Sequence, residues 1–340
     1  MRKLLVGFAL VILISAAAYF RFHHSKGSRE TAYVGSRQVM LWSTTAQVRE
    51  QVGTVNYGER LEILDRSQDQ LHVRTTNGLI GWITQGDLLS SEMWQKAKDL
   101  ESETRTLPVE ARGHTRALAN LHIAAARESP RIRQLNKTVP LDLFERKVVE
   151  VPLAPTAVTV QEPQPGVSPD AQAPAAKKED WWLVRAHLAD QTTTSGWLLR
   201  RFVDLDVPSP LPDYANSAGM HIVAWFELNR VNDAAGELKP QYLLVGSRDA
   251  EGQPCDFTLM RVYTWGKKRE RYETAFVESD LCGKLPVKLM EPTAPGADVT
   301  FSFEDWNASA AQRRIYAMRQ TIVKQLRQDG APPRGKHARR

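Results

Sequence analysis

The stretch Leu71–Ile83, LHVRTTNGLIGWI, decides the fold of the amino-terminal half of this chain. Its first four residues alternate between apolar and polar, which is the pattern of a strand with one buried face. Asn77-Gly78 is the strongest short hairpin signal, because both central residues of such a turn need positive φ. The chain then returns as a second strand, in which Gly81 beside Trp82 indicates a close approach of another backbone. The stretch therefore predicts a tightly bent β-hairpin.

Working outward from this hairpin, the preceding residues also have the texture of strands and turns. Gln38–Trp42 is rich in apolar residues, and Val52–Val55 follows it. Tyr57-Gly58-Glu59 is typical of a turn, and Leu61–Leu64 alternates as a half-buried strand does. Residues 31–90 are therefore predicted to form one small β-rich domain.

The same order of segments recurs in residues 114–206, which are predicted to form a second domain. The paired segments, first copy then second, are Gln38–Trp42 with Leu118–Ile123, Tyr57-Gly58 with Val139-Pro140, Leu61–Ile63 with Leu141–Leu143, Leu71–Arg74 with Trp182–Arg185, and Ile80–Ile83 with Ser195–Leu198. Agreement at several offsets is stronger support for an internal repeat than any single motif. Residues 152–176 interrupt the second copy with six prolines, a composition that predicts a loop that does not pack.

Within residues 32–90, the series Val-Gly-x-Val, Tyr-Gly-Glu, Leu-x-Val-Arg and Gly-Trp-Ile resembles the bacterial SH3-like (SH3b) domain family. Residues 114–206 resemble it once the insert is removed. The resemblance implies two small β-barrels that serve as extracytoplasmic binding or targeting modules, often on peptidoglycan or peptides. Trp42 and Tyr57 stand at loop positions and are the candidate residues of a ligand groove, whereas Trp82 and Trp197 are expected to pack beside their glycines.

Residues 1–30 contain an uncharged run from Leu4 to Phe20, preceded by Arg2 and Lys3. A helix of this length spans about 25 Å, slightly less than a ~30 Å hydrocarbon core, and flanking arginines can cover the difference. The run favours a signal anchor, with a single pass through the inner (cytoplasmic) membrane and the bulk of the protein in the periplasm. The alternatives are a secreted protein after signal cleavage near Ala16-Ala17-Ala18, and a buried helix of a soluble domain.

A linking helix is predicted for residues 91–108, between the two copies. Its apolar stripe at helical spacing comprises Met93, Trp94, Ala97 and Leu100. Pro108 ends it, and the helix is expected to pack as a strut on the first domain.

Residues 220–328 are predicted to form a carboxy-terminal antiparallel β domain with a terminal helix, followed by a basic tail at residues 329–340. Strands are expected at Met220–Val231, Gln241–Gly246, Phe257–Trp265, Tyr272–Glu278 and Val299–Phe303. The helix, over residues 308–328, is predicted from the apolar stripe Ala311, Ile315, Met318, Ile322 and Leu326. This region resembles no family known to us.

The two cysteines, Cys255 and Cys282, both fall in this β domain. If Trp265 pairs with Tyr272 across a hairpin, the same register places the cysteines opposite one another at its open end. Opposed positions of this kind come within disulfide reach, and an oxidising compartment would permit the bond. We therefore predict a disulfide, with two buried free thiols as the alternative.

The chain carries no recognisable catalytic constellation. A nucleophilic cysteine needs a base, usually His, and only His221 lies in the body of the carboxy-terminal domain. The sequence contains no zinc-binding spacing, no G-x-S-x-G, no P-loop and no G-x-G-x-x-G. We expect no enzyme, no metal and no cofactor. A cell-wall hydrolase is the remote alternative, and it requires His221 close to Cys255 with a free thiol.

The formal net charge of +6 would by itself suggest nucleic acid as a partner. Residues 1–30 and 311–340 contribute +4 and +8 of that total, so the residues between them are net −6. A nucleic-acid site needs a basic patch on a folded domain, so we expect none. The sequence favours a non-enzymatic, membrane-tethered envelope protein that binds a cell-wall polymer or a peptide. The alternative is an envelope scaffold that binds a protein partner through the carboxy-terminal domain.

Overall fold

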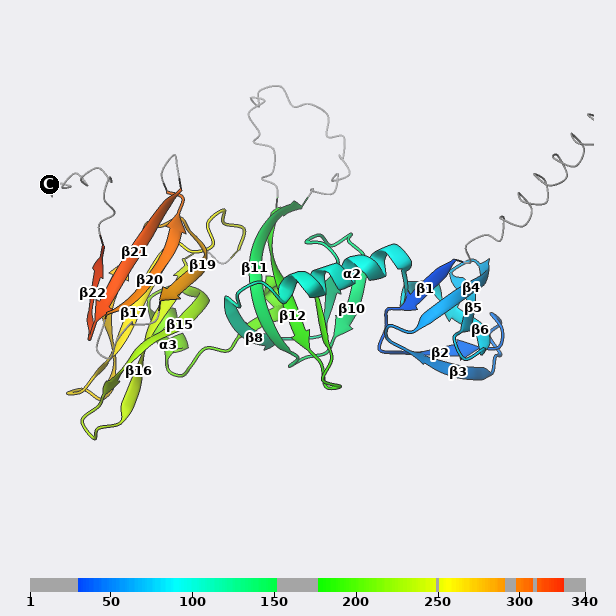
Figure 1. Ribbon diagram of the computed structural model, residues 1–340, viewed down its shortest axis with the longest axis horizontal. Coiled ribbons are helices and arrows are strands. Elements are labelled where there is room, and N and C mark those ends of the chain that lie inside the picture. Colours follow the sequence, from blue (N-terminus) through cyan, green and yellow to red (C-terminus); the bar gives the residue numbers. More distant parts are fainter. Residues whose placement is uncertain (1–29, 152–176, 249–250, 291–297, 308–310, 327–340) are drawn as a thin grey trace, which may run out of the picture. The chain divides into compact units, whose positions relative to one another are not determined.

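The computed structural model describes residues 30–151, 177–248, 251–290, 298–307 and 311–326. These residues are mainly β-strand, in antiparallel sheets, which confirms the mainly β part of the predicted fold class (Figure 1). Among them, no helix is both long and apolar enough to cross a membrane. The predicted membrane segment up to residue 29, the insert 152–176 and the basic tail lie outside the described residues. The chain divides into two compact units, residues 1–96 and 97–340.

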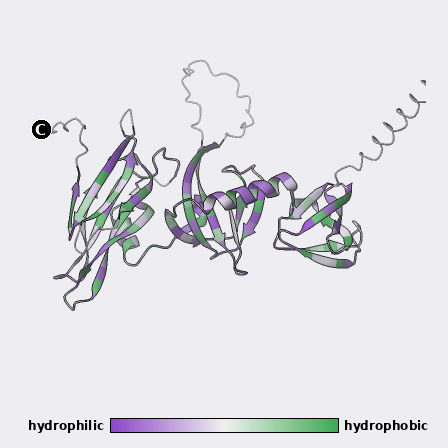
Figure 2. Cartoon of the chain, in the orientation of Figure 1, coloured by the Kyte–Doolittle hydropathy of each residue, from purple (hydrophilic) through white to green (hydrophobic). Residues whose placement is uncertain are grey.

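The first unit contains one seven-stranded antiparallel sheet, here named the first copy. Its strands are β1 (Thr31–Val34), β2 (Gln38–Trp42), β3 (Gln51–Asn56), β4 (Arg60–Ser67), β5 (Gln70–Thr75), β6 (Ile80–Thr84) and β7 (Leu88–Ser90). They lie in the order β3-β2-β6-β5-β4-β1-β7. The apolar residues of the alternating strands meet in one core, and Figure 2 shows hydrophobic and hydrophilic residues intermixed along these strands.

The second copy repeats this topology strand for strand. Its strands are β8 (Ala111–Thr115), β9 (Ala119–His122), β10 (Arg131–Leu135), β11 (Pro140–Val151), β12 (Lys177–His187), β13 (Thr193–Leu199) and β14 (Val203–Leu205). Their order, β10-β9-β13-β12-β11-β8-β14, is the order of the first sheet with each strand number raised by seven. A short 3-10 turn precedes the last strand in each copy, Gln85–Asp87 (η1) and Arg200–Phe202 (η2).

The register of the strands tests the predicted alignment of the two copies. Leu61 pairs with Ala32 and Leu141 with Gly113, so Leu61 and Leu141 are equivalent, as predicted. The predicted alignment matches Tyr57-Gly58 with Val139-Pro140, which lies two residues too far along the second copy. Gly58 and Thr138, both at positive φ, each donate a backbone hydrogen bond to the end of the first strand of their copy. Thr138, rather than Pro140, therefore matches Gly58, because Thr138 adopts the left-handed conformation that glycine usually supplies.

The glycine of each Gly-Trp pair is required by a close approach, as the sequence predicts. A Cβ atom on Gly196 would lie 2.8 Å from the His122 carbonyl oxygen and 2.8 Å from Leu121 Cγ. At Gly81 the corresponding distances are 3.0 Å to Leu41 Cβ and 3.1 Å to the Trp42 oxygen. The sheet bends here so tightly that a side chain does not fit.

The predicted linking helix is present as α2 (Ser91–Thr104). In the first unit, Trp94 of this helix stacks on Tyr33 with ring centroids 4.8 Å apart and lies over Gly58. In the second unit, Thr104 shares a 2.7 Å hydrogen bond with Ser195, and its carbonyl accepts from Arg185 at 3.3 Å. The apolar stripe read from the sequence is therefore a packing surface.

The carboxy-terminal domain is built from two four-stranded antiparallel sheets and a short helix. The first sheet contains β15 (His221–Asn232), β16 (Leu238–Ser247), β17 (Leu259–Gly266) and β18 (Arg271–Glu278). The second contains β19 (Gly283–Met290), β20 (Val299–Asp305), β21 (Gln312–Arg319) and β22 (Ile322–Gln325). Residues of both sheets share one hydrophobic core, while α3 (Leu211–Ser217) covers part of the outer face of the first sheet.

The predicted terminal helix over residues 308–328 is wrong, because the described part of this segment forms the hairpin β21–β22. The residues of the predicted stripe do not share one face of this strand, and Ile322 and Leu326 of the stripe are 61% and 44% exposed. Pairing with β20 selects the strand instead. In that conformation Tyr316 and Met318 are completely buried. Arg314 of β21 is half-buried and forms ion pairs with Glu278 and Asp305.

One buried arginine joins the second copy to the carboxy-terminal domain. Arg146 of β11, with a side chain 4% exposed, donates to Asp180 at 2.8 and 3.2 Å. It also donates to the carbonyls of Gln253 and Cys255, each at 3.0 Å, and to the Asp256 carboxylate at 3.2 Å. We call this arrangement the Arg146 clasp. A single cluster of buried apolar residues also runs through both domains.

Glu110 is buried near the same junction, with 4% of its surface exposed. Burial raises the pKa of its carboxyl to about 7, and the negative charge of Asp256 adds to the rise. The backbone N–H of Val287 hydrogen-bonds to the carboxyl and opposes the rise. In the folded protein this side chain therefore takes up a proton close to neutral pH.

Replacing Gly196 with alanine should destabilise the second unit by about 1–3 kcal/mol, because the added methyl group collides with backbone as well as side chains. Urea unfolding followed by tryptophan fluorescence would measure the change. Gly86→Ala is the matched control, since a Cβ atom there meets nothing within 4 Å, and it should stay within about 0.5 kcal/mol of the parent. Equal effects of the two variants would contradict the close approach.

The pKa of Glu110 predicts a pH dependence of stability. The ordinary pKa of this carboxyl is 4.5, and its pKa in the folded protein is about 7. Between these two pH values the folded protein holds a proton that the unfolded chain has released. Stability should therefore fall as pH rises through this window, by roughly 2 kcal/mol, and then level off. Glu110→Gln should remove this part of the dependence, whereas the exposed Glu103→Gln should not. Melting temperatures at pH 5 and pH 8 would distinguish them.

Candidate functional site

Three aromatic side chains form a row across the first sheet. Trp82 of β6 pairs with Trp42 of β2 on one side and with His72 of β5 on the other. Directly paired residues point to the same side of a sheet, and their neighbours Leu41 and Val73 are buried on the opposite side. The rings of His72 and Trp82 stack with centroids 4.7 Å apart. All three side chains are half-buried and lie on the outer surface.

Exposed apolar side chains extend this row along the strands. Met40 and Ile80, each two residues from a tryptophan of the row, are 48% and 40% exposed. Since alternate residues of a strand share one face, these two lie on the same side as the tryptophans. We call Met40, Trp42, His72, Ile80 and Trp82 the aromatic face. A surface of this composition can stack against flat apolar groups, such as sugar rings or peptide side chains.

Cationic groups border the aromatic face. The guanidinium carbon of Arg49 lies 4.3 Å from the ring centroid of Trp42. The segment that carries Arg49 is closed at its base by a hydrogen bond of 2.9 Å from the Ser43 N–H to the Glu50 carbonyl. Arg74, two residues from His72, is paired with Glu62 at 3.3 Å. Arg49 can therefore meet an anionic group of a ligand that stacks on Trp42. Sequence reasoning missed Arg49, because no local pattern places it over the ring.

Tyr57, the other predicted groove residue, does not lie beside Trp42. Its backbone N–H donates to the Arg37 carbonyl, at the opposite end of β2 from Trp42. Five residues of strand correspond to about 16 Å. The Tyr57 ring packs edge-on against Trp94 of α2, with centroids 5.6 Å apart. The structure therefore separates the two predicted residues and gives Tyr57 a packing role.

The equivalent face of the second copy is partly covered, although Trp197 and His122 remain half-buried. Trp197 takes the place of Trp82, and its neighbours in the row are His122 and Leu183. Leu183 is 1% exposed, and the nearby Trp181 is also 1% exposed. The carboxyl end of α2 contacts this face through the bonds from Thr104 described above. The two copies thus share a topology but differ in which of them leaves its outer face open.

The predicted disulfide between Cys255 and Cys282 is present, with Cα atoms 4.8 Å apart. Trp265 pairs with Tyr272, as the prediction assumed, but a bulge after Val262 shifts the register of the hairpin. The cysteines lie beyond the ends of β17 and β18, where backbone bonds rather than a regular ladder bring them together. The sequence thus predicted the bond correctly, but the register on which the prediction relied does not continue as far as the cysteines.

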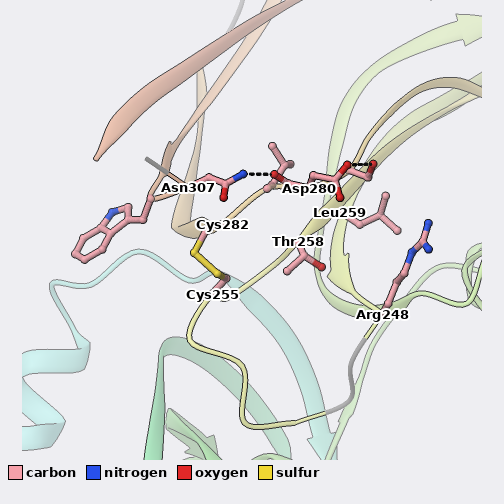
Figure 3. Close-up of a pocket in the computed structure, with 10 residues that line it drawn as sticks. Arg248, Cys255, Thr258, Leu259, Asp280, Cys282 and Asn307 are labelled. Atoms are coloured by element: carbon pink, nitrogen blue, oxygen red, sulfur yellow. Dashed lines mark hydrogen bonds between the residues drawn. A yellow bond between two sulfur atoms is a disulfide. The ribbon is translucent and has the colours of Figure 1, made fainter. Parts of the chain in front are cut away.

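Both cysteines line a pocket of about 720 Å³ at one end of the carboxy-terminal domain (Figure 3). Its other lining residues are Arg248, Thr258, Leu259, Ser279, Asp280, Leu281, Trp306 and Asn307. The side-chain amide of Asn307 donates to the carbonyl of Asp280, and the Ser279 hydroxyl to its carboxylate at 3.1 Å. The pocket is polar and its walls come from three different connections of the chain.

One requirement of the hydrolase alternative, a free thiol at Cys255, is not met in this structure. Cys255 is bonded to Cys282, so it carries no thiol that a base could activate. His221 lies on β15, where it pairs with Ser247. Among the described residues, no group of three or more His, Cys, Asp or Glu side chains could hold a metal ion.

Comparisons with known proteins give little. No family model and no curated protein matches the chain. Among solved structures, the chain is similar to an NlpC/P60 family protein from Bacillus cereus ATCC 10987, with 12% sequence identity and a TM-score of 0.21. The similarity covers 59% of this chain and just under two thirds (65%) of that protein. The chain is also similar to NlpC2 from Trichomonas vaginalis, at 10% identity and a TM-score of 0.17, over 88% and 100%. At these scores neither likeness carries an argument.

Removing the disulfide should lower the stability of the second unit. With a sequence separation of 27 residues, a Cys255→Ser/Cys282→Ser variant should lose about 3–4 kcal/mol, because the unfolded chain regains the entropy of an open loop. Urea unfolding of parent and variant would measure the difference. Parent protein reduced in denaturant and refolded with dithiothreitol should match the variant. A loss below about 1 kcal/mol would contradict this account.

Proposed function

We propose that this protein is a non-enzymatic, membrane-tethered protein of the cell envelope whose first copy is an SH3-like module that binds cell-wall polymer or peptide. The aromatic face of the first copy carries this proposal. It is the one of the two equivalent faces that leaves a tryptophan row, two exposed apolar side chains and Arg49 open to a ligand.

The composition of the aromatic face fits this class of ligand. Peptidoglycan consists of sugar rings, which stack on tryptophan, and of short peptides, whose carboxylates a guanidinium can neutralise. Trp42 can supply the stacking contact and Arg49 the charged one, and the guanidinium carbon of Arg49 lies 4.3 Å from the ring centroid of Trp42. An envelope location also fits the Cys255–Cys282 bond, since disulfides persist in oxidising compartments. The tether in this proposal is the apolar run of residues 4–20.

The two copies have different roles in this proposal. The partly covered face of the second copy and the Arg146 clasp make that copy the support of the carboxy-terminal domain. The first copy, whose corresponding face is uncovered, is the module that meets the ligand. The shared strand order of the two sheets supports an origin of both from one kind of module.

Retention on purified peptidoglycan sacculi tests the binding proposal. The purified protein should sediment with sacculi, and Trp42→Ala should weaken retention about tenfold, because loss of a stacking contact costs on the order of 1–2 kcal/mol. Arg49→Ala should weaken it less. Binding isotherms from the sedimented fraction would measure these changes.

Trp197→Ala, the equivalent substitution in the second copy, is the matched control and should leave retention unchanged. Tyr57→Ala should lower thermal stability through its contact with Trp94, also without loss of retention at temperatures where the fold persists. If the parent protein does not sediment with sacculi, wall binding is wrong, and a scaffold that binds a protein partner becomes the better hypothesis.

A further inference from the structure

The Cys255–Cys282 disulfide is not enclosed in the core of its domain. Both cysteines are partly exposed, and both line the pocket of about 720 Å³ that opens at the end of the carboxy-terminal domain (Figure 3). A space of this size admits a small dithiol or the tip of a protein loop. Exposed disulfides are the ones that undergo exchange with external thiols, whereas buried ones resist it.

The backbone on the Cys255 side is held in place without the disulfide. The Arg146 clasp fixes the carbonyls of Gln253 and Cys255 and the carboxylate of Asp256. The N–H of Gly252, at the start of the same segment, donates to Asp180 at 2.9 Å. These contacts are made by buried groups of the second copy, so they persist when the sulfur–sulfur bond opens.

The backbone on the Cys282 side is also held independently. The Cys282 N–H donates to the Asp305 carboxylate at 2.9 Å, and its carbonyl accepts from the Trp306 N–H at 2.8 Å. The next residue, Gly283, exchanges backbone hydrogen bonds of 2.9 and 3.2 Å with Phe257. The two cysteine backbones therefore remain neighbours whether or not the sulfurs are bonded.

The attacking species in thiol–disulfide exchange is a thiolate, so the charges that line the pocket bear on its approach. Arg248 lines the pocket, and the ammonium of Lys284 lies near the Cys255 segment, bound to the Pro254 carbonyl and 3.4 Å from Asp256. Asp280 is the acidic side chain of the lining, and its carboxylate accepts from Ser279. The lining thus carries one exposed cation, Arg248, whose charge offsets that of Asp280 for an incoming thiolate.

We propose that Cys255–Cys282 is a site of reversible thiol–disulfide exchange in the folded protein, reached through this pocket by a dithiol. One thiolate of the dithiol attacks a protein sulfur, which forms a mixed disulfide and releases the other cysteine as a thiolate. The second thiolate of the dithiol then displaces the first cysteine. Two electrons pass to the protein, the dithiol leaves as a disulfide, and its two protons end on the cysteine thiols. Because the backbones stay in place, a disulfide oxidant reverses the reaction.

The first experiment reduces the full chain with dithiothreitol in native buffer, traps thiols by alkylation and counts them by mass spectrometry. Both cysteines should be alkylated while the far- and near-ultraviolet circular dichroism remain those of the folded protein. After removal of the reductant, oxidised glutathione should restore the bond. A bond that resists dithiothreitol until guanidinium is added, or a fold that is lost on reduction, would overturn the proposal.

The second experiment tests the path of access. Arg248→Glu should slow reduction by dithiothreitol about threefold or more, and the difference should shrink at high salt, because a screened charge no longer attracts the thiolate. Lys268→Glu is the control, since it makes the same charge change in the connection between β17 and β18, at the opposite end of β17 from the pocket. Equal rates for the two variants would show that the thiolate does not enter through the pocket.

Discussion

The Arg146 guanidinium is the contact on which the second unit depends. Its side chain is 4% exposed and faces Asp180 and Asp256, which are 2% and 10% exposed. Burial of these three charges is compatible with a stable fold because every N–H donor of the guanidinium has an acceptor, and two of these acceptors are backbone carbonyls. The carbonyls belong to the segment that carries Cys255, so the same side chain joins two domains and positions one end of the disulfide.

The two sheets of identical strand order differ in how far their outer faces are covered. Each presents an outer face with a tryptophan after a constrained glycine, yet helix contacts and buried apolar residues partly cover that face in the second copy. Burial of Trp181 and Leu183 there stabilises the unit, and the same positions cannot then meet a ligand. In the first copy the row of Trp42, Trp82 and His72 is left uncovered. Two sheets of the same strand order thus present one mainly packed outer surface and one candidate binding surface.

The outcome for particular residues shows what could be predicted. The hairpin over Leu71–Ile83 and the strand repeat depend on local alternation and turn chemistry, so the sequence was sufficient. The segment after residue 311 carries an apolar stripe at helical spacing, but pairing with β20 makes it a strand whose buried residues are Tyr316 and Met318. Trp42 was predicted at a loop position but lies half-buried in β2, and Tyr57, predicted for the same groove, packs on Trp94. Arg146 carries no local signal, because its partners are distant in the sequence. Arg49 is close to Trp42 in the sequence, but no local pattern indicates that the connection between β2 and β3 places it over the ring.

The sequence by itself determined the mainly β class, the internal repeat, the linking helix and the pairing of the two cysteines. Each of these follows from periodicity, turn residues or register, which act over a few neighbouring positions. Only the tertiary structure decided which of two equivalent faces stays open, where Tyr57 packs and which backbone segments flank the disulfide. These features depend on long-range burial and on pairing of charges, whose free energies exceed local preferences but leave no trace in local sequence.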